Sequence, residues 1–148
     1  ALEFAQGNGL ALAFDDYDAL CASRDLDAVY IGTPHATHFD LARRALRAGK
    51  HVLCEKPLTM TADEARELGR TAAASGAFLM EAMWMKFSPA MQRAAELVGS
   101  GLIGEPRFLQ AGLGFPVPPD GPRRYWDAAL GGGALYDLGV YTITLAQA

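Results

Sequence analysis

The 148-residue sequence is poor in cysteine, which argues against a small protein held together by several disulfides. It contains only Cys21 and Cys54, and neither belongs to a Cys-x-x-Cys pair. A disulfide framework therefore has no support, and a reducing cytoplasm fits this usage best. Cys54 lies inside an apolar run, where we expect a buried and inert thiol.

Long apolar runs and basic stripes are also missing. No run approaches the roughly 20 residues of a membrane-spanning helix, and no signal-peptide pattern opens the chain. Acidic residues outnumber lysine and arginine by 17 to 13, for a net charge of −4. We therefore expect neither a membrane nor a nucleic acid as partner. The composition, 51% hydrophobic and 20% charged, is that of a globular protein.

Two apolar segments, each followed by polar or turn residues, carry most of the functional signal. Ala28–Gly32 precedes Thr33-Pro34, and His51–Cys54 precedes Glu55-Lys56-Pro57. The intervening segment Phe39–Ala48 predicts a helix, so the order is strand, helix, strand. Apolar strands of this kind are typical of a sheet covered on both faces. The carboxyl ends of parallel strands share one edge, where ligands of open α/β sheets bind.

Further strands and helices alternate along the first half of the chain. The predicted elements are a strand at Leu10–Phe14, a helix at Tyr17–Ala22 capped by Asp16, a helix from the Thr61–Glu64 capping box to Ser75, and a strand at Ala77–Met80. Gly49 and Gly76 are expected to end helices in left-handed conformation. This β-α-β-α-β series predicts a doubly wound parallel sheet.

The pattern changes after a predicted domain boundary near Ala82–Phe87. The second half predicts a helix at Pro89–Val98, a half-exposed antiparallel strand at Pro106–Gly114, a proline-rich surface loop at Phe115–Pro122, and a helix at Ala134–Ala148 after the glycines 131–133. The triple glycine permits close backbone approach at the start of that helix.

Four segments together resemble the Gfo/Idh/MocA family of oxidoreductases. They are Asp27–Pro34, His38, Ala48–Pro57 and Gly131–Tyr141. The resemblance implies an N-terminal Rossmann domain that holds NAD or NADP. It also implies a C-terminal α/β domain with an open, mainly antiparallel sheet that holds the substrate. Residues 1–83 would then be part of the first domain, and residues 84–148 the start of the second.

The resemblance also implies that the chain starts within the second helix of the Rossmann domain. The first strand and its glycine-rich turn, and the residue that separates NAD from NADP, would then be absent. Glu81–Pro89 and Asp137–Tyr141 are similar to a branch that includes dimeric trans-dihydrodiol dehydrogenase and NADP-linked xylose dehydrogenase. Branch members often have arginine where Lys86 stands. If that position meets a cofactor phosphate, Lys86 offers a point charge in place of a planar fork.

Hydride transfer from an alcohol needs a base for the hydroxyl proton and a cation for the developing negative charge. Tyrosine is a poor base at neutral pH, but a neighbouring ammonium group favours the phenolate. Lys56 and Tyr141 could form such a pair, supported by Asp137 one helical turn before Tyr141. The plainer alternatives are a solvated lysine, a packed aromatic, and an aspartate that only caps a helix or forms a salt bridge.

Four further residues are candidates for contact with the cofactor. Thr33 and Pro34 end a strand and could meet adenosine or ribose through the backbone, or form an ordinary turn. Glu55 could accept hydrogen bonds from ribose hydroxyls, or form a salt bridge. By resemblance His38 lies near the cofactor, and an ordinary histidine at a helix start is the alternative.

Two tryptophans complete the predicted site. Trp84 could form a wall of the nicotinamide pocket. Trp126 could do the same for the substrate, which Asp137 could also bind, although a core position is the alternative for Trp126. The resemblance further implies a cis bond between Lys56 and Pro57. No metal site is predicted, because no third histidine or paired cysteine supports His35 and His38.

The sequence thus predicts an NAD(P)-dependent oxidoreductase that moves a hydride between a nicotinamide cofactor and a sugar or cyclic diol. By resemblance the full-length protein is expected to form a homo-oligomer. A truncated chain without the phosphate-binding turn is expected to bind dinucleotide weakly and to be inactive. The alternative from another class is a dinucleotide-binding sensor or inactive subunit without catalysis.

Overall fold

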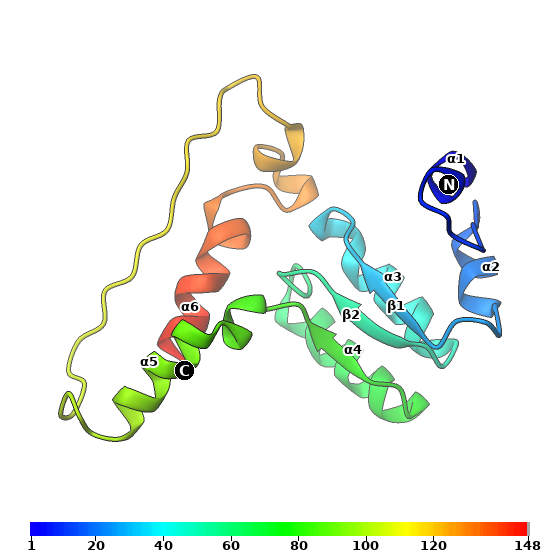
Figure 1. Ribbon diagram of the computed structural model, residues 1–148. Coiled ribbons are helices and arrows are strands. Elements are labelled where there is room, and N and C mark those ends of the chain that lie inside the picture. Colours follow the sequence, from blue (N-terminus) through cyan, green and yellow to red (C-terminus); the bar gives the residue numbers. More distant parts are fainter. Residues whose placement is uncertain (148) are drawn as a thin grey trace.

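The computed structural model describes residues 1–147, and its centre is a parallel sheet (Figure 1). The strands β1 (Ala28–Ile31), β2 (His51–Cys54) and β3 (Leu79–Glu81) lie in the order β1-β2-β3. The register pairs Ile31 with Cys54 and Cys54 with Glu81. All three strands therefore end at one edge, which confirms the predicted α/β class.

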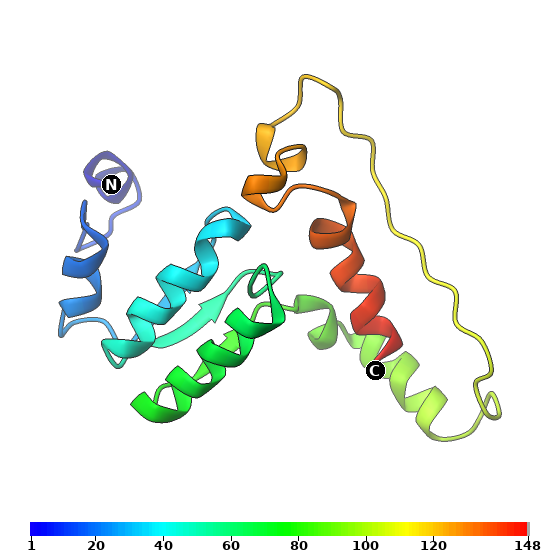
Figure 2. The same cartoon turned by 180° about the vertical axis from the view of Figure 1, so that it is seen from behind.

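Two helices cover one face of this sheet. The helices α3 (His38–Arg47) and α4 (Ala62–Ser75) lie side by side over the strands, as the reverse view shows (Figure 2). Both helices turn small or aliphatic residues inward, and Leu46, Leu68 and Val52 are almost completely buried between the layers. Burial of such side chains stabilises the domain by about 1.5–3 kcal/mol each.

The capping residues that the sequence predicted at helix ends are present in the structure. Asp16 caps α2 (Tyr17–Ala22) by accepting a hydrogen bond of 2.7 Å from the amide of Ala19. Thr61 and Glu64 form the predicted capping box at the start of α4. Gly76, with φ of 67°, ends α4 in left-handed conformation. The third strand begins two residues later than predicted.

The predicted strand at Leu10–Phe14 is wrong. The segment follows α1 (Leu2–Gly7) as irregular chain, and Leu10 and Leu12 are 53% and 46% exposed. A strand exists only as part of a ladder, because its amide and carbonyl groups need partners. In the described chain the sheet consists of β1 to β3, so this segment has no ladder to join.

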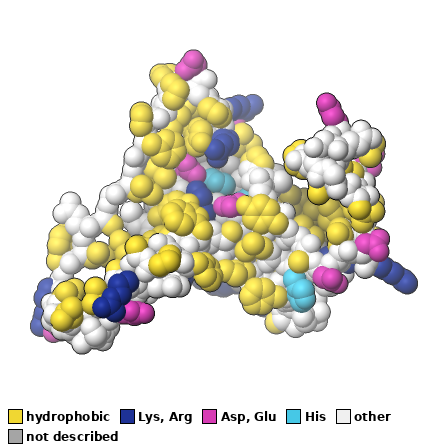
Figure 3. All heavy atoms as spheres, viewed as in Figure 1, with side chains coloured by type: hydrophobic (Ala, Val, Ile, Leu, Met, Phe, Trp, Pro, Cys, Tyr) yellow, Lys and Arg dark blue, Asp and Glu magenta, His cyan; other side chains and the backbone are white. Residues whose placement is uncertain are grey.

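Coverage of the sheet on both faces is also not observed within residues 1–147. Tyr30 and Leu53 point away from α3 and α4 and are 60% and 38% exposed. Hydrophobic side chains are accordingly visible over this face of the molecule (Figure 3). The apolar strand residues were compatible with a sheet covered on both faces, but α3 and α4 cover only one face.

The second half leaves the sheet through a 3₁₀ turn at Trp84–Phe87 and α5 (Pro89–Gly99). The predicted strand at Pro106–Gly114 is wrong, because this segment is extended and exposed but pairs with no strand in the described chain. Figure 1 shows it as a long arc away from the other elements. The antiparallel sheet expected for this half is therefore not formed within residues 1–147.

The chain then returns to the sheet edge through two 3₁₀ turns, Arg123–Tyr125 and Ala128–Leu130. The predicted helix at Ala134–Ala148 divides into a π-helical turn, Leu135–Gly139, and α6 (Val140–Ala146). Its predicted end at Ala148 lies outside the described residues. No helix in residues 1–147 is long and apolar enough to cross a membrane.

Candidate active site

Lys56 and Asp137 meet between the sheet edge and the π-helical turn. Lys56 follows β2, and its bond to Pro57 is cis, as the sequence resemblance implied. The Lys56 ammonium donates to Oδ1 of Asp137 at 2.8 Å and to the Asp137 backbone carbonyl at 2.7 Å. The two side chains are only 13% and 16% exposed. The pair is therefore less screened than a surface ion pair, and the solvated-lysine interpretation does not hold.

Tyr141 joins this pair through its ring. The Lys56 nitrogen lies 5.1 Å from the ring centroid, within cation–π range. The Tyr141 oxygen accepts a hydrogen bond of 3.0 Å from Nε1 of Trp84, and the two rings meet edge to face. The structure thus brings all three predicted catalytic residues together, although Lys56 bonds to Asp137 and not to the Tyr141 oxygen.

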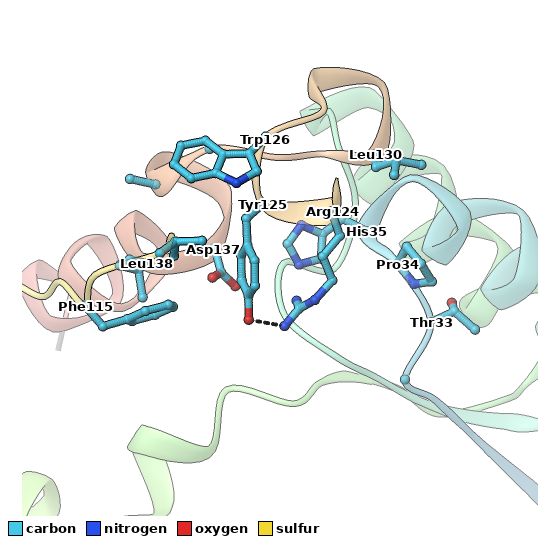
Figure 4. Close-up of a pocket in the computed structure, with 14 residues that line it drawn as sticks. Thr33, Pro34, His35, Phe115, Arg124, Tyr125, Trp126, Leu130, Asp137 and Leu138 are labelled. Atoms are coloured by element: carbon cyan, nitrogen blue, oxygen red, sulfur yellow. Dashed lines mark hydrogen bonds between the residues drawn. The ribbon is translucent and has the colours of Figure 1, made fainter. Parts of the chain in front are cut away.

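A cavity of about 600 Å³ lies beside this cluster. Its walls come from the carboxyl end of β1 and from the returning chain, and Figure 4 shows Thr33 and Pro34 on one side with Trp126 and Phe115 on the other. Asp137 lines the cavity as well. Four predicted residues, Thr33, Pro34, Trp126 and Asp137, are therefore placed at one cavity, with Trp126 57% exposed and not in the core.

Sequence reasoning missed other residues of the cavity wall. Arg124 and Tyr125 point into it, joined by a short hydrogen bond from the guanidinium to the phenol oxygen, and Phe115 packs edge to face on Tyr125 (Figure 4). Phe115 lies in irregular chain, and Arg124 and Tyr125 lie in a 3₁₀ turn that is too short to show periodicity. Their only signal in the sequence is the position of Arg124 and Tyr125 directly before Trp126.

The sequence suggested His35 only as a metal ligand. In the structure its side chain bonds the returning chain to the sheet edge. Its Nδ1 donates to the Gly131 carbonyl at 3.1 Å, and burial lowers the pKa of His35. A side chain at Gly131 would collide with the Met60 sulfur at 2.7 Å and with Cβ of His35 at 2.8 Å. The close approach expected of the triple glycine is thus observed at Gly131.

His38 does not line the cavity. Its side chain is fully buried, and its two ring nitrogens lie 2.8 Å from the backbone carbonyls of Pro57 and Thr33. Both polar atoms are already occupied, so the side chain has none left for a dinucleotide. The resemblance implied that His38 lies near the cofactor; in the structure its contacts are with the protein backbone.

Glu55, Trp84 and Lys86 lie outside the cavity wall. Glu55 accepts a hydrogen bond of 2.6 Å from the Tyr30 hydroxyl, and this bond raises the pKa of Tyr30. Trp84 is 62% exposed beside Tyr141. Lys86 is exposed and lines a separate, smaller hollow near α5, so the structure does not bring it to the catalytic cluster.

The groups at the sheet edge suit a dinucleotide. Among residues 1–147 no group of three histidine, cysteine or acidic side chains is arranged for a metal ion. The exposed residues Thr33 and Pro34 and one ammonium group at Lys56 lie at the carboxyl edge of a parallel sheet. This is the position in which open α/β sheets bind nucleotides, and the residues present fit such a ligand.

Comparison with known proteins gives a consistent result. A family model described as an oxidoreductase family with an NAD-binding Rossmann fold matches residues 1–83. A model for the GFO/IDH/MocA C-terminal domain matches residues 91–148. Trans-1,2-dihydrobenzene-1,2-diol dehydrogenase of Xenopus tropicalis is 38% identical over 146 residues, which cover 97% of this chain and 43% of that protein.

Two further relatives come from Actinomadura kijaniata. A dTDP-3,4-didehydro-2,6-dideoxy-alpha-D-glucose 3-reductase is 43% identical over 132 residues, covering 89% of this chain and 40% of the relative. The crystal structure of a 3-ketoreductase with NADP and TDP-benzene is similar with a TM-score of 0.87 and 41% identity, covering 99% and 44%. The chain thus spans less than half the length of these relatives. It belongs to the Gfo/Idh/MocA family of oxidoreductases.

Proposed function

We propose that the protein containing this chain is an NAD(P)-dependent oxidoreductase. It moves a hydride between the nicotinamide and a hydroxyl or carbonyl carbon of a sugar or cyclic diol. The observation that carries this proposal is the meeting of Lys56, Asp137 and Tyr141 beside a cavity at the carboxyl edge of the sheet. The names of the relatives, a diol dehydrogenase and a dTDP-sugar reductase, support this substrate class.

The residues that would hold the dinucleotide are Thr33 through its backbone N–H, Pro34 through its ring at the cavity wall, Lys56 through its ammonium group and Glu55 through its carboxylate. NADP is the proposed form, supported by the NADP-bound ketoreductase. When bound, the nicotinamide supplies the site that accepts or donates the hydride. Trp84 stands beside Tyr141.

Tyr141 exchanges the proton of the substrate hydroxyl in this mechanism. As its oxygen loses the proton, the Lys56 ammonium group stabilises the negative charge, and Trp84 Nε1 donates a hydrogen bond to the same oxygen. Asp137 keeps the ammonium group in place through two short hydrogen bonds. Asp137 also faces the cavity, where it can accept a bond from a second substrate hydroxyl, with Trp126 as an apolar wall.

The substitution Tyr141→Phe in the full-length protein tests this mechanism. It removes the proton-exchanging oxygen and keeps the ring, so kcat should fall by about 10²- to 10⁴-fold while NADP binding is retained. Steady-state kinetics on sugars and trans-diols, with fluorescence titration of NADPH, measure both quantities. Tyr17→Phe, which removes a hydroxyl bonded to the Leu41 carbonyl, is the matched control and should leave kcat unchanged.

Two results would contradict the proposal. Undiminished turnover in Tyr141→Phe would remove the assigned base. Tight NADPH binding without turnover of any sugar or diol would instead favour the sensor or inactive-subunit hypothesis.

We also propose a cytoplasmic location and a homo-oligomeric state for the full-length protein. The location is supported by two free, buried cysteines, and burial raises the pKa of Cys54 to about 12. The oligomer, and the expectation of neither nucleic acid nor membrane as partner, rest on the sequence alone. Fractionation and size-exclusion chromatography with light scattering test these points.

A further inference from the structure

One peptide group next to Lys56 is held at both ends by side chains. The group joins Pro57 to Leu58, and its carbonyl oxygen lies 2.8 Å from Nδ1 of His38. Its amide nitrogen donates to Oε1 of Glu81, also at 2.8 Å. His38 begins α3 and Glu81 ends β3, so two separate elements hold one peptide of the loop.

The His38 side of this arrangement is completely buried. Nε2 of the same ring lies 2.8 Å from the Thr33 carbonyl, so the ring bridges the loops that follow β1 and β2. A carbonyl oxygen only accepts hydrogen bonds, so the contact with Pro57 is a hydrogen bond when the ring carries its proton on Nδ1. A buried carbonyl that loses such a donor is left unsatisfied, at a cost of about 1–3 kcal/mol.

The Glu81 side follows from the register of the sheet. Glu81 pairs with Cys54, the last residue of β2, which places its carboxylate beside the loop that begins at Glu55. An ionised carboxylate accepts hydrogen bonds only, and a bond from a backbone amide to such a group is stronger than one between neutral partners. The Leu58 amide is therefore firmly fixed.

Neither His38 nor Glu81 reaches the cavity, because neither belongs to its wall. Glu81 bonds to the loop that carries Lys56, and His38 contacts both that loop and the Thr33 carbonyl. The Lys56 ammonium group must lie within hydrogen-bond distance of Asp137. Displacing a catalytic group by about 1 Å can cost about 10²-fold in rate. Any effect of these two side chains on catalysis must therefore pass through the loops that they hold, and for Glu81 this is the loop of Lys56 alone.

We propose that His38 and Glu81 are positioning residues that clamp the Pro57–Leu58 peptide and thereby fix the Lys56 ammonium group against Asp137. This inference rests on the proposed function for its kinetic consequence, but not for its structural one. The position of Lys56 can be measured without any turnover.

Matched substitutions distinguish the effect of losing the hydrogen bonds to the Pro57–Leu58 peptide from the effect of changing a buried side chain. The amide nitrogen of asparagine takes the place of Nδ1, whereas that of glutamine takes the place of Nε2. His38→Asn therefore places a donor at the Pro57 carbonyl, and His38→Gln places one only at the Thr33 carbonyl. Likewise Glu81→Gln keeps an acceptor oxygen for the Leu58 amide, and Glu81→Leu removes it.

The first readout is the rate of reductive methylation of Lys56, followed by mass spectrometry of the full-length protein. His38→Gln and Glu81→Leu should raise this rate at least about 5-fold, because the ammonium group leaves its place at Asp137 and becomes more exposed. His38→Asn and Glu81→Gln should stay near the original rate. Circular dichroism and thermal unfolding identify any variant that does not fold. If His38→Gln or Glu81→Leu does not fold, the methylation rates of Lys56 in His38→Asn and Glu81→Gln are the deciding measurement, and a raised rate in either would contradict the clamp.

The second readout is kinetic. His38→Gln and Glu81→Leu should lower kcat by about 10- to 100-fold with little change in the KM for NADPH. In a Lys56→Met background the same two changes should cause no further loss of kcat, because the group that they position is gone.

The outcomes are distinct. Unchanged methylation in His38→Gln and Glu81→Leu, or an equal further loss of kcat in the Lys56→Met background, would overturn the clamp. Faster methylation combined with a Lys56→Met variant of full activity would confirm the clamp and overturn the proposed catalytic role of Lys56.

Discussion

The ammonium group of Lys56 illustrates how single side chains determine this site. It has two oxygen acceptors on Asp137 and an aromatic ring at Tyr141 within reach. A largely buried charge is stable only when it is paired and hydrogen-bonded. The same contacts that satisfy the ammonium group therefore also fix it near the phenol.

His35 provides a test at the scale of one residue. Because burial lowers the pKa of His35, the unfolded chain, with a pKa near 6.5, binds more protons than the folded one in mildly acidic solution. Stability should therefore fall as the pH drops from about 6.5 through the lower folded-state pKa. His35→Asn, which keeps a donor for the Gly131 carbonyl but cannot titrate, should weaken this dependence.

Urea unfolding at pH 7.5 and at pH 5.5 measures the effect for both proteins. If His35→Asn loses as much stability between these two pH values as the original protein does, then His35 is not the group responsible.

At the scale of elements, the start of α4 matters because the loop that carries Lys56 runs directly into it. Glu64 accepts hydrogen bonds from the amides of Met60 and Thr61, and Thr61 accepts one from Glu64. The capping box thus orders the end of the loop as well as the first turn of the helix. A π-helical turn carries Asp137 on the opposite side, and such turns are frequent at functional sites.

We expect Thr61→Ala to lower the free energy of unfolding by about 1 kcal/mol, because the Glu64 amide loses its side-chain acceptor. Thr61→Ser keeps the hydroxyl and should stay within a few tenths of a kcal/mol of the original protein. Chemical denaturation of the two variants provides the measurement. Equal stabilities would show that the box contributes nothing measurable.

At the scale of the whole molecule, three contacts join the returning chain to the sheet edge. They are the Lys56–Asp137 ion pair, the bond from His35 to the Gly131 carbonyl and the bond of 2.8 Å from the Tyr136 hydroxyl to the Met60 carbonyl. All three lie close to the cavity. In Figure 3 charged and histidine side chains gather in the hollow between the two parts.

Gly131→Ala should weaken the contact between the returning chain and the sheet edge. Gly131 and Gly49 have nearly equal φ values of 79° and 77°, so alanine costs a similar backbone strain of about 1–2 kcal/mol at both. Only at Gly131 would the new methyl group meet Met60 and His35, whereas Gly49 has open space around it. Gly131→Ala should therefore destabilise the protein more than Gly49→Ala, and also lower affinity for NADPH.

Thermal unfolding and NADPH titration of both variants test this expectation. Equal losses of stability, with unchanged NADPH affinity in Gly131→Ala, would mean that the close approach at Gly131 is unimportant for the cavity.

The sequence alone determined what depends on neighbours in the chain. Asp16, Thr61 and Gly76 lie at helix ends because their caps are satisfied within a few residues, and β2 was predicted to the residue. The apolar strands and the polar residues after them were sufficient to place Lys56 at a ligand-binding edge. The family resemblance added Tyr141 and Asp137 across the site.

Only the tertiary structure decided what depends on distant partners. Leu10–Phe14 and Pro106–Gly114 have strand-like residues but no neighbouring strand, and a ladder cannot form without one. Arg124 and Tyr125 reach the cavity because the chain folds back between irregular turns. His38 and Glu81 contact one peptide because α3 begins and β3 ends beside it, and no local pattern encodes such a meeting.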